Sequence, residues 1–192
     1  MIRVSEMEAF CYDKAMSKLL LILVCGLPGC GKSTIANLLA NREGYPVFSI
    51  DPIESGILKS GFERTKTTET AAYYIAENLA EYQLSLGNSL IVDSVSASMQ
   101  QKSHWMKIAE KFGAKLKVIE CVCDDQELQM QRINSRNRNI FGIPEISLSG
   151  LRKYKGAYSQ WKIDHIQLNA VTDVETNYRY AVEYLKSPNS IL

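Results

Sequence analysis

The sequence predicts an α/β fold in which a parallel sheet of about five strands has helices on both faces and carries a helical lid. Three observations support this class. An aliphatic run at residues 19–25 leads directly into a glycine-rich loop. Segments of strand length then alternate with segments of helical periodicity along the rest of the chain. The 46% hydrophobic and 22% charged composition is that of an ordinary globular domain.

The segments expected to form strands are short, rich in aliphatic residues and bounded by turn residues. They are residues 19–25, 45–51, 89–93, 115–123 and 166–171. The first is purely apolar and is expected to be buried.

The segments expected to form helices show apolar residues three and four apart, or begin after capping residues. They are residues 32–42, 68–86, 99–112, 147–161 and 175–185, with one further helix after Asp124-Asp125. In the longest, Ile75, Leu79, Tyr82 and Leu86 are spaced as one buried stripe.

The chain is expected to form one domain at residues 18–192, with an N-terminal extension at residues 1–17 and a lid at about residues 132–150. A net charge of +1 gives no global attraction to nucleic acid or to a membrane surface. Five cysteines without metal-binding spacing argue against a disulfide framework or a zinc site. The first apolar run is too short to span a bilayer and precedes no cleavage site, so a cytoplasmic protein is expected.

A phosphate-binding loop follows the first strand, in the full G-x-x-x-x-G-K-[ST] pattern. It reads Gly26, Leu27, Pro28, Gly29, Cys30, Gly31, Lys32, Ser33 and Thr34. Glycines let backbone N–H groups turn toward an anion, and the next helix presents its positive end to the same phosphates. Lys32 would contact the β- and γ-phosphates and Ser33 would bind Mg²⁺. The alternative is a turn without a ligand, but the flanking strand and helix favour nucleoside triphosphate binding.

Two aspartates end predicted strands. Asp93 ends an aliphatic strand. Proteins with a phosphate-binding loop carry at this position an acid that orients Mg²⁺ opposite the serine of the loop. Asp51 ends the second strand, where a carboxylate can accept the proton of an acceptor hydroxyl during phosphoryl transfer. The alternatives are a solvated aspartate at position 93 and an Asp-Pro turn or helix cap at position 51. Which of the two is the base stays open at this point.

Three arginines follow the fourth strand. Arg132 and Arg136 are four residues apart and are expected to share one face of a helix, with Arg138 just beyond. Such arginines suit a lid that neutralises charge as the γ-phosphoryl group leaves. The alternative is a solvated basic face, which the intervening asparagines and the lack of paired acids disfavour.

The G-L-P-G-C-G-K-S-T loop, the strands ending at Asp51 and Asp93, and the R-x-x-x-R lid together resemble the small P-loop kinases related to polynucleotide kinase, zeta toxin and chloramphenicol phosphotransferase. The resemblance implies the three-layer P-loop nucleoside triphosphate hydrolase fold, with the second and third strands on one side of the first. It also implies ATP-dependent phosphorylation of a hydroxyl, with Lys32 and Ser33 on the phosphates and Mg²⁺, Asp51 as general base, and Arg132 and Arg136 in the lid.

The acceptor is expected to be a small molecule. Polynucleotide kinases carry an arginine three residues after the base, and here that position is Glu54. The sequence therefore predicts a kinase that uses ATP and Mg²⁺ to phosphorylate a small-molecule hydroxyl. Two alternatives stay open. One is a nucleic-acid or nucleotide 5′-hydroxyl kinase with a basic groove built from Lys59, Arg64 and Lys66. The other is a nucleotide-binding regulatory ATPase with a protein partner.

Overall fold

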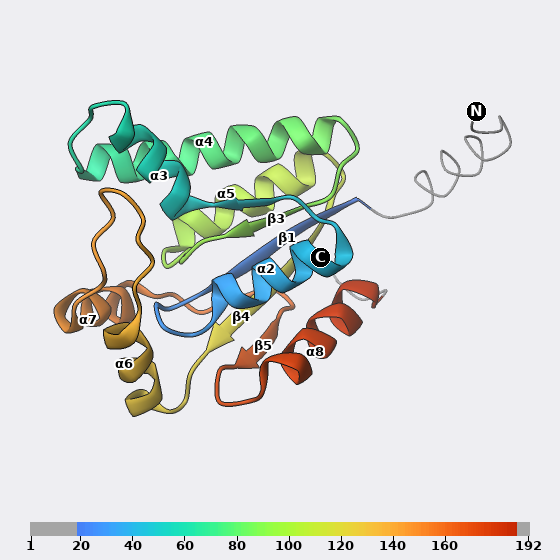
Figure 1. Cartoon of the computed structure of the whole chain (residues 1–192). Coiled ribbons are helices and arrows are strands. Elements are labelled where there is room, and N and C mark those ends of the chain that lie inside the picture. Colours follow the sequence, from blue (N-terminus) through green and yellow to red (C-terminus); the bar gives the residue numbers. More distant parts are fainter. Residues whose placement is uncertain (1–18, 188–192) are drawn as a thin grey trace, which may run out of the picture.

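A computed structural model describes residues 19–187, and its centre is a parallel sheet in the order β2-β3-β1-β4-β5. The strands are β1 Leu20–Gly26, β2 Val47–Ser49, β3 Leu90–Asp93, β4 Lys115–Val122 and β5 Ile166–Asn169. Every neighbouring pair is parallel, and β2 and β3 lie on the same side of β1 (Figure 1). The predicted three-layer α/β fold is confirmed. The proposed extension at residues 1–17 lies outside the described residues.

The helices are α2 Lys32–Glu43, α3 Ile50–Lys59, α4 Lys66–Ser85, α5 Met99–Lys111, α6 Gln126–Ser135, α7 Leu148–Ala157 and α8 Val174–Lys186. Helix α3 was not predicted, and it corrects the second strand, which ends at Ser49 instead of Asp51. Asp51 and Pro52 occupy the first turn of α3. Proline needs no backbone N–H there, and aspartate is favoured by the helix dipole. None of the helices within residues 19–187 is long and apolar enough to cross a bilayer.

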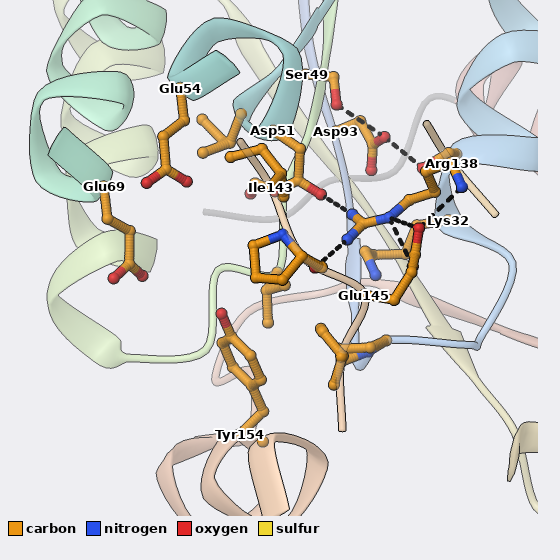
Figure 2. A pocket seen from close by; sticks show the side chains of 18 of the residues that line it. Lys32, Ser49, Asp51, Glu54, Glu69, Asp93, Arg138, Ile143, Glu145 and Tyr154 are labelled. Carbon is orange, nitrogen blue, oxygen red and sulfur yellow. Dashed lines mark hydrogen bonds and ion pairs between the residues drawn. The ribbon is translucent and has the colours of Figure 1, made fainter. Parts of the chain in front are cut away.

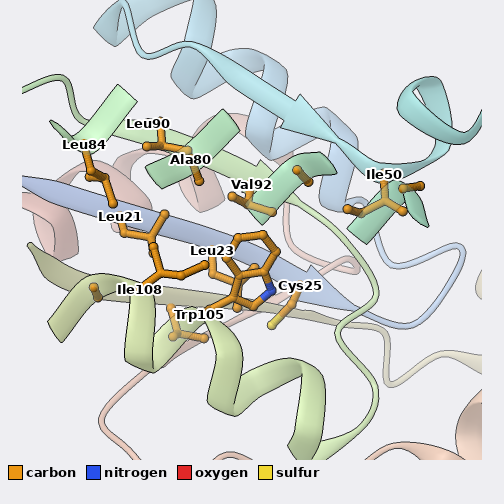
Figure 3. Packing of buried hydrophobic residues seen from close by; sticks show 14 of the residues in the cluster. Leu21, Leu23, Cys25, Ile50, Ala80, Leu84, Leu90, Val92, Trp105 and Ile108 are labelled. Carbon is orange, nitrogen blue, oxygen red and sulfur yellow. The ribbon is translucent and has the colours of Figure 1, made fainter. Parts of the chain in front are cut away.

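Strand β1 divides the core into two halves because its side chains alternate between the two faces of the sheet. Leu21, Leu23 and Cys25 pack against α4 and α5, where Trp105 is fully buried (Figure 3). Residues of opposite parity in β1 pack against α2 and α8 on the other face. The sheet is therefore covered on both sides, which explains why β1 contains no polar side chain.

The buried face of α4 differs from the predicted one. Ile75, Leu79, Tyr82 and Leu86 are exposed, by 39%, 38%, 62% and 53% respectively. The buried residues are Thr68, Ala72, Ala76, Ala80 and Leu84, and all but Leu84 are small. Small side chains allow a helix to approach a sheet closely, so α4 packs mainly through its alanines and leaves Ile75, Leu79 and Tyr82 exposed. The spacing of the large apolar residues therefore predicted the wrong buried face for α4.

Three helices lie close together at the edge of the sheet formed by the carboxyl ends of the strands. Helices α3, α6 and α7 gather beyond the carboxyl ends of the strands, and the segment between α6 and α7 reaches toward α3 (Figure 1). There the Ser55 hydroxyl donates to the Phe141 carbonyl at 2.8 Å. This edge is where ligands bind in open parallel sheets.

Candidate active site

The phosphate-binding loop connects β1 to α2, and its glycines are required by its geometry. Gly26 has a φ of 129°, and a Cβ there would lie 2.1 Å from the Cys121 carbonyl oxygen of β4. Gly31 caps α2 at a φ of 83°, a conformation that only glycine adopts without strain. The Lys32 Nζ donates to the Leu27 carbonyl at 3.1 Å, so the ammonium folds back over the loop.

Three oxygen-bearing side chains meet at the mouth of this loop. The Ser33 hydroxyl donates to Asp93 Oδ2 at 2.7 Å, and the Ser49 hydroxyl donates to the same oxygen at 3.2 Å. The register that aligns Asp93 with Ser49 of β2 and Val24 of β1 brings them together. Asp93 is buried, with 6% of its surface exposed, so it is not the solvated aspartate of the alternative interpretation.

These residues suit Mg²⁺. The ion prefers oxygen ligands and usually binds through one or two carboxylates together with substrate phosphates. No group of three or more His, Cys, Asp or Glu side chains within residues 19–187 is arranged to hold a metal. A Mg²⁺ ion at this edge would therefore take the Ser33 hydroxyl, the Asp93 carboxylate and phosphate oxygens.

Asp51 lines the same cavity as Lys32, Ser33 and Asp93, and the cavity encloses about 270 Å³. Its carboxylate forms an ion pair with Arg138 (Figure 2). Asp51 lies in the first turn of α3 and also lines the cavity beside the phosphate loop. A role at the start of a helix and a role as general base are therefore compatible. Its side chain is 45% exposed and accessible to an acceptor.

Arg138 is the most extensively bound cation of the site, and only 9% of its side chain is exposed. Besides Asp51, its guanidinium contacts Glu145 at 3.1 Å and the Pro144 carbonyl at 3.1 Å (Figure 2). Helix α3 and the segment between α6 and α7 are thus joined at the cavity. No local pattern connects Arg138 with Asp51, because the two residues are 87 positions apart in the sequence.

Arg132 and Arg136 do not share a helix face, which corrects the sequence-based expectation. Helix α6 ends at Ser135, and Arg136 caps it in extended conformation. Arg136 lines the cavity of Asp51, where burial and then the charge of Arg138 lower the pKa of its guanidinium. No hydrogen bond or ion pair of Arg136 is formed with residues 19–187, so its donors are available to a phosphate.

Arg132 lies on the other side of the phosphate loop. It donates to the Ala170 carbonyl at 3.0 Å and lines a second cavity of about 210 Å³. That cavity also borders Gly31 and Thr34 of the loop and Asn177 of α8. The phosphate loop therefore lies between two cavities, of which the first is lined by Arg136 and Arg138 and the second by Arg132.

Gln129 of α6 is a contact to the phosphate loop that the sequence analysis missed. Its buried amide donates to the Pro28 carbonyl at 2.8 Å and to the Cys30 sulfur at 3.3 Å. Burial raises the pKa of the Cys30 thiol to about 11, so this cysteine is a poor nucleophile at neutral pH. A buried glutamine on a polar helix gives no sequence signal, since its role depends on a loop about 100 residues away.

We expect Gln129→Leu to destabilise the protein by about 1–3 kcal/mol, because it leaves the Pro28 carbonyl without its donor. Urea unfolding measures the change in free energy. Gln126→Leu, at the exposed start of the same helix, is the control and should change stability by less than about 0.5 kcal/mol. Equal stability of the two variants would contradict this role of Gln129.

The outer part of the cavity lies beyond Asp51 and is bordered by α3, α4 and α7. Its lining consists of Glu54, Arg64, Glu69, Tyr73 and Tyr154, which we call the outer wall. Among the aromatic and acidic residues of α4, Tyr73 and Glu69 belong to this wall. Tyr74 and Glu77 border a different cavity, and Tyr82 is exposed.

Comparisons with known proteins agree with this fold. A family model described as an AAA domain matches residues 21–158. No curated protein matches the sequence significantly. A structure described as that of a kinase from Chloroflexus aurantiacus shares 18% identity, with a TM-score of 0.73 over 88% of this chain and 100% of that one.

Two further structures carry more specific names. A gluconokinase from Sinorhizobium meliloti is 14% identical, with a TM-score of 0.64 over 88% of this chain and 91% of its own. An APS kinase from Mycobacterium tuberculosis, in complex with AMPPNP and APS, is 16% identical, with a TM-score of 0.62 over 88% and 99%. At these identities the likeness is one of fold, and the fold is that of P-loop kinases.

Proposed function

We propose that this chain, which belongs to the AAA domain family through residues 21–158, is a kinase. It would use ATP to phosphorylate a hydroxyl group of a small molecule. The observation that carries the proposal is a shared cavity: Lys32 and Ser33 of the phosphate loop line the same space as the Asp51 carboxylate. A donor phosphate on the loop and an acceptor hydroxyl at Asp51 would meet there.

The donor would span the two cavities. The phosphates would lie on the loop, with Lys32 and Arg136 facing the γ-phosphate and the nucleoside in the cavity of Arg132. Mg²⁺, held by Ser33 and Asp93, would neutralise phosphate charge. The cations on either side of the loop would then stabilise the charge that develops on the leaving phosphate.

Asp51 would act as the general base. It accepts the proton of the acceptor hydroxyl, whose oxygen forms a bond to the γ-phosphorus while the bond to the leaving ADP oxygen breaks. The ion pair with Arg138 orients the carboxylate. Phosphoryl transfer requires little covalent help, so holding the two substrates in line supplies most of the rate enhancement.

A polynucleotide acceptor is less well supported than a small molecule. Of the three cations expected to form a basic groove, Arg64 is paired with Glu54 at 3.2 Å and Lys66 with Glu69 at 3.0 Å. Each pair neutralises a charge that would otherwise attract phosphates. The gluconokinase among the structural neighbours is named for a small-molecule acceptor, which agrees with this choice.

Release of ADP tests the proposal. Purified protein with Mg·ATP is offered small hydroxyl compounds and, separately, a 5′-hydroxyl oligonucleotide at low salt. The proposal expects release that depends on a small compound. Labelling of the oligonucleotide alone would favour the polynucleotide alternative. Tight GTP binding without acceptor-dependent turnover would favour a regulatory nucleotidase.

A further inference from the structure

The cavity of Asp51 is divided by charge. Near the phosphate loop, Lys32 and Arg136 line the cavity together with the carboxylates of Asp93 and Glu145. Toward the outer wall, the carboxylates of Asp51, Glu54 and Glu69 line the cavity with two guanidinium groups, those of Arg64 and Arg138. An acceptor in the outer half therefore meets an excess of negative charge.

Glu54 is already bound by side chains of the protein. Its side chain is 2% exposed, and its carboxylate accepts from Arg64 at 3.2 and 3.3 Å and from the Thr68 hydroxyl at 3.4 Å. Arg64 is 41% exposed, so part of its charge is screened by solvent. Glu54 thus has its own partners and does not need a ligand.

Glu69 differs from Glu54 because its ion-pair partner, Lys66, is largely exposed to solvent. The Lys66 ammonium, 3.0 Å from Glu69, has a side chain that is 79% exposed, whereas Glu69 is 28% exposed and borders the cavity. Such exposed ion pairs contribute little stability. A cation that enters the cavity can replace Lys66 at small cost. Figure 2 shows the carboxylates of Glu69 and Glu54 and the hydroxyl of Tyr154 at this side of the cavity.

The carboxylates of the cavity affect the pKa values of the two tyrosines of the outer wall, Tyr73 and Tyr154. Burial raises the pKa of Tyr154, and the charges of Glu69 and Asp51 raise it further. The pKa of Tyr73 is raised by burial as well, with the same two carboxylates adding to the shift. Both shifts show that Glu69 and Asp51 lie close enough to act on groups of the outer wall.

We propose that the acceptor carries an ammonium group in addition to the hydroxyl that is phosphorylated, and that Glu69 binds this ammonium. The inference rests on the proposed kinase function and specifies its substrate class. The cavity of about 270 Å³ also has to admit the γ-phosphate, so the acceptor is small, on the scale of an amino alcohol or a single amino sugar. A carboxylate or phosphate on the acceptor would be repelled.

Matched compounds of different charge test the inference. Glucosamine, glucose and glucuronate form one set, and 2-amino-1,3-propanediol, glycerol and glycerate form another. ADP release and calorimetric binding to the protein with Mg·AMPPNP are measured for each. The amines should exceed their neutral counterparts by about tenfold in kcat/KM or in affinity, as one charge-assisted hydrogen bond provides. No difference within the sets, or a preference for the carboxylates, would overturn the inference.

Two variants of the same ion pair separate a binding role of Glu69 from a structural one. Glu69→Gln should weaken amine binding by about tenfold with an unchanged KM for ATP. Lys66→Gln removes the competing ammonium and should leave amine binding equal or tighter. If Glu69 served only to pair with Lys66, both variants would behave alike, and that result would overturn the inference. Glu81→Gln, on the same helix and paired with Lys111, is the control.

The failure of this inference is distinguishable from failure of the kinase proposal. Lys32-dependent phosphorylation of a neutral or anionic compound would retain the kinase and refute the ammonium. Transfer to water only, whatever compound is present, would refute the kinase itself.

Discussion

Asp51→Asn should reduce acceptor-dependent phosphoryl transfer by a factor of about 10² to 10⁴ while ATP affinity stays close to that of the native protein. The amide keeps the shape of the side chain but cannot accept the hydroxyl proton. Asp51 lies in the first turn of α3 and touches no residue of the phosphate loop through a hydrogen bond within residues 19–187, so donor binding should be preserved. Single-turnover kinetics and a nucleotide titration measure the two effects separately.

A companion variant decides which aspartate is the base. Asp93→Asn removes the carboxylate that accepts from Ser33 and Ser49, so its defect should include weaker Mg²⁺ binding and be partly rescued at high Mg²⁺. Asp51→Asn should show no such rescue. Asp164→Asn, at an exposed position, serves as the control. Near-native turnover of Asp51→Asn would refute its assignment as base, and rescue of both variants by Mg²⁺ would assign both to the metal.

Lys32→Ala should weaken both nucleotide binding and turnover. In the proposed function, the ammonium would donate to the triphosphate in the ground state and to the more charged γ-phosphoryl group during transfer. We expect a loss of about 10- to 100-fold in ATP affinity, as for a charged hydrogen bond, and a further loss of about 10²-fold in turnover.

Calorimetric titration with AMPPNP measures the first of these effects, and single-turnover kinetics measure the second. Lys59→Ala, at the exposed last turn of α3, is a lysine control that should leave both unchanged. Unchanged nucleotide affinity of Lys32→Ala would argue against the phosphate-binding role of the loop.

The sequence predicted the donor side of the site far better than the acceptor side. The loop and Asp93 are read from adjacent residues, because a strand, a turn and a helix in succession determine where their side chains point. The parallel sheet then places Ser33 and Asp93 at the same edge, 2.7 Å apart, although 60 residues separate them. Local sequence patterns are enough to predict this part of the site, because the parallel sheet brings the ends of its strands to the same edge.

The acceptor side depends on contacts that no local pattern encodes. Arg138 reaches Asp51 only because the segment after α6 folds back on α3, and Tyr154 enters the cavity from α7. Glu69 borders the cavity because α4 packs on its alanines, while apolar spacing favoured the opposite face. The R-x-x-x-R spacing was also misleading, since α6 ends before Arg136.

Transfer of the γ-phosphoryl group itself is the most direct test of the account. The protein is incubated with Mg²⁺, ATP labelled in the γ-phosphate and the small-molecule fraction of a cell extract, and the products are separated as orthophosphate and organic phosphates. We expect label in an organic phosphate ester, lost with Asp51→Asn and with Lys32→Ala but retained with Asp164→Asn. Label in orthophosphate only, at equal rates for the native protein and Asp51→Asn, would contradict it.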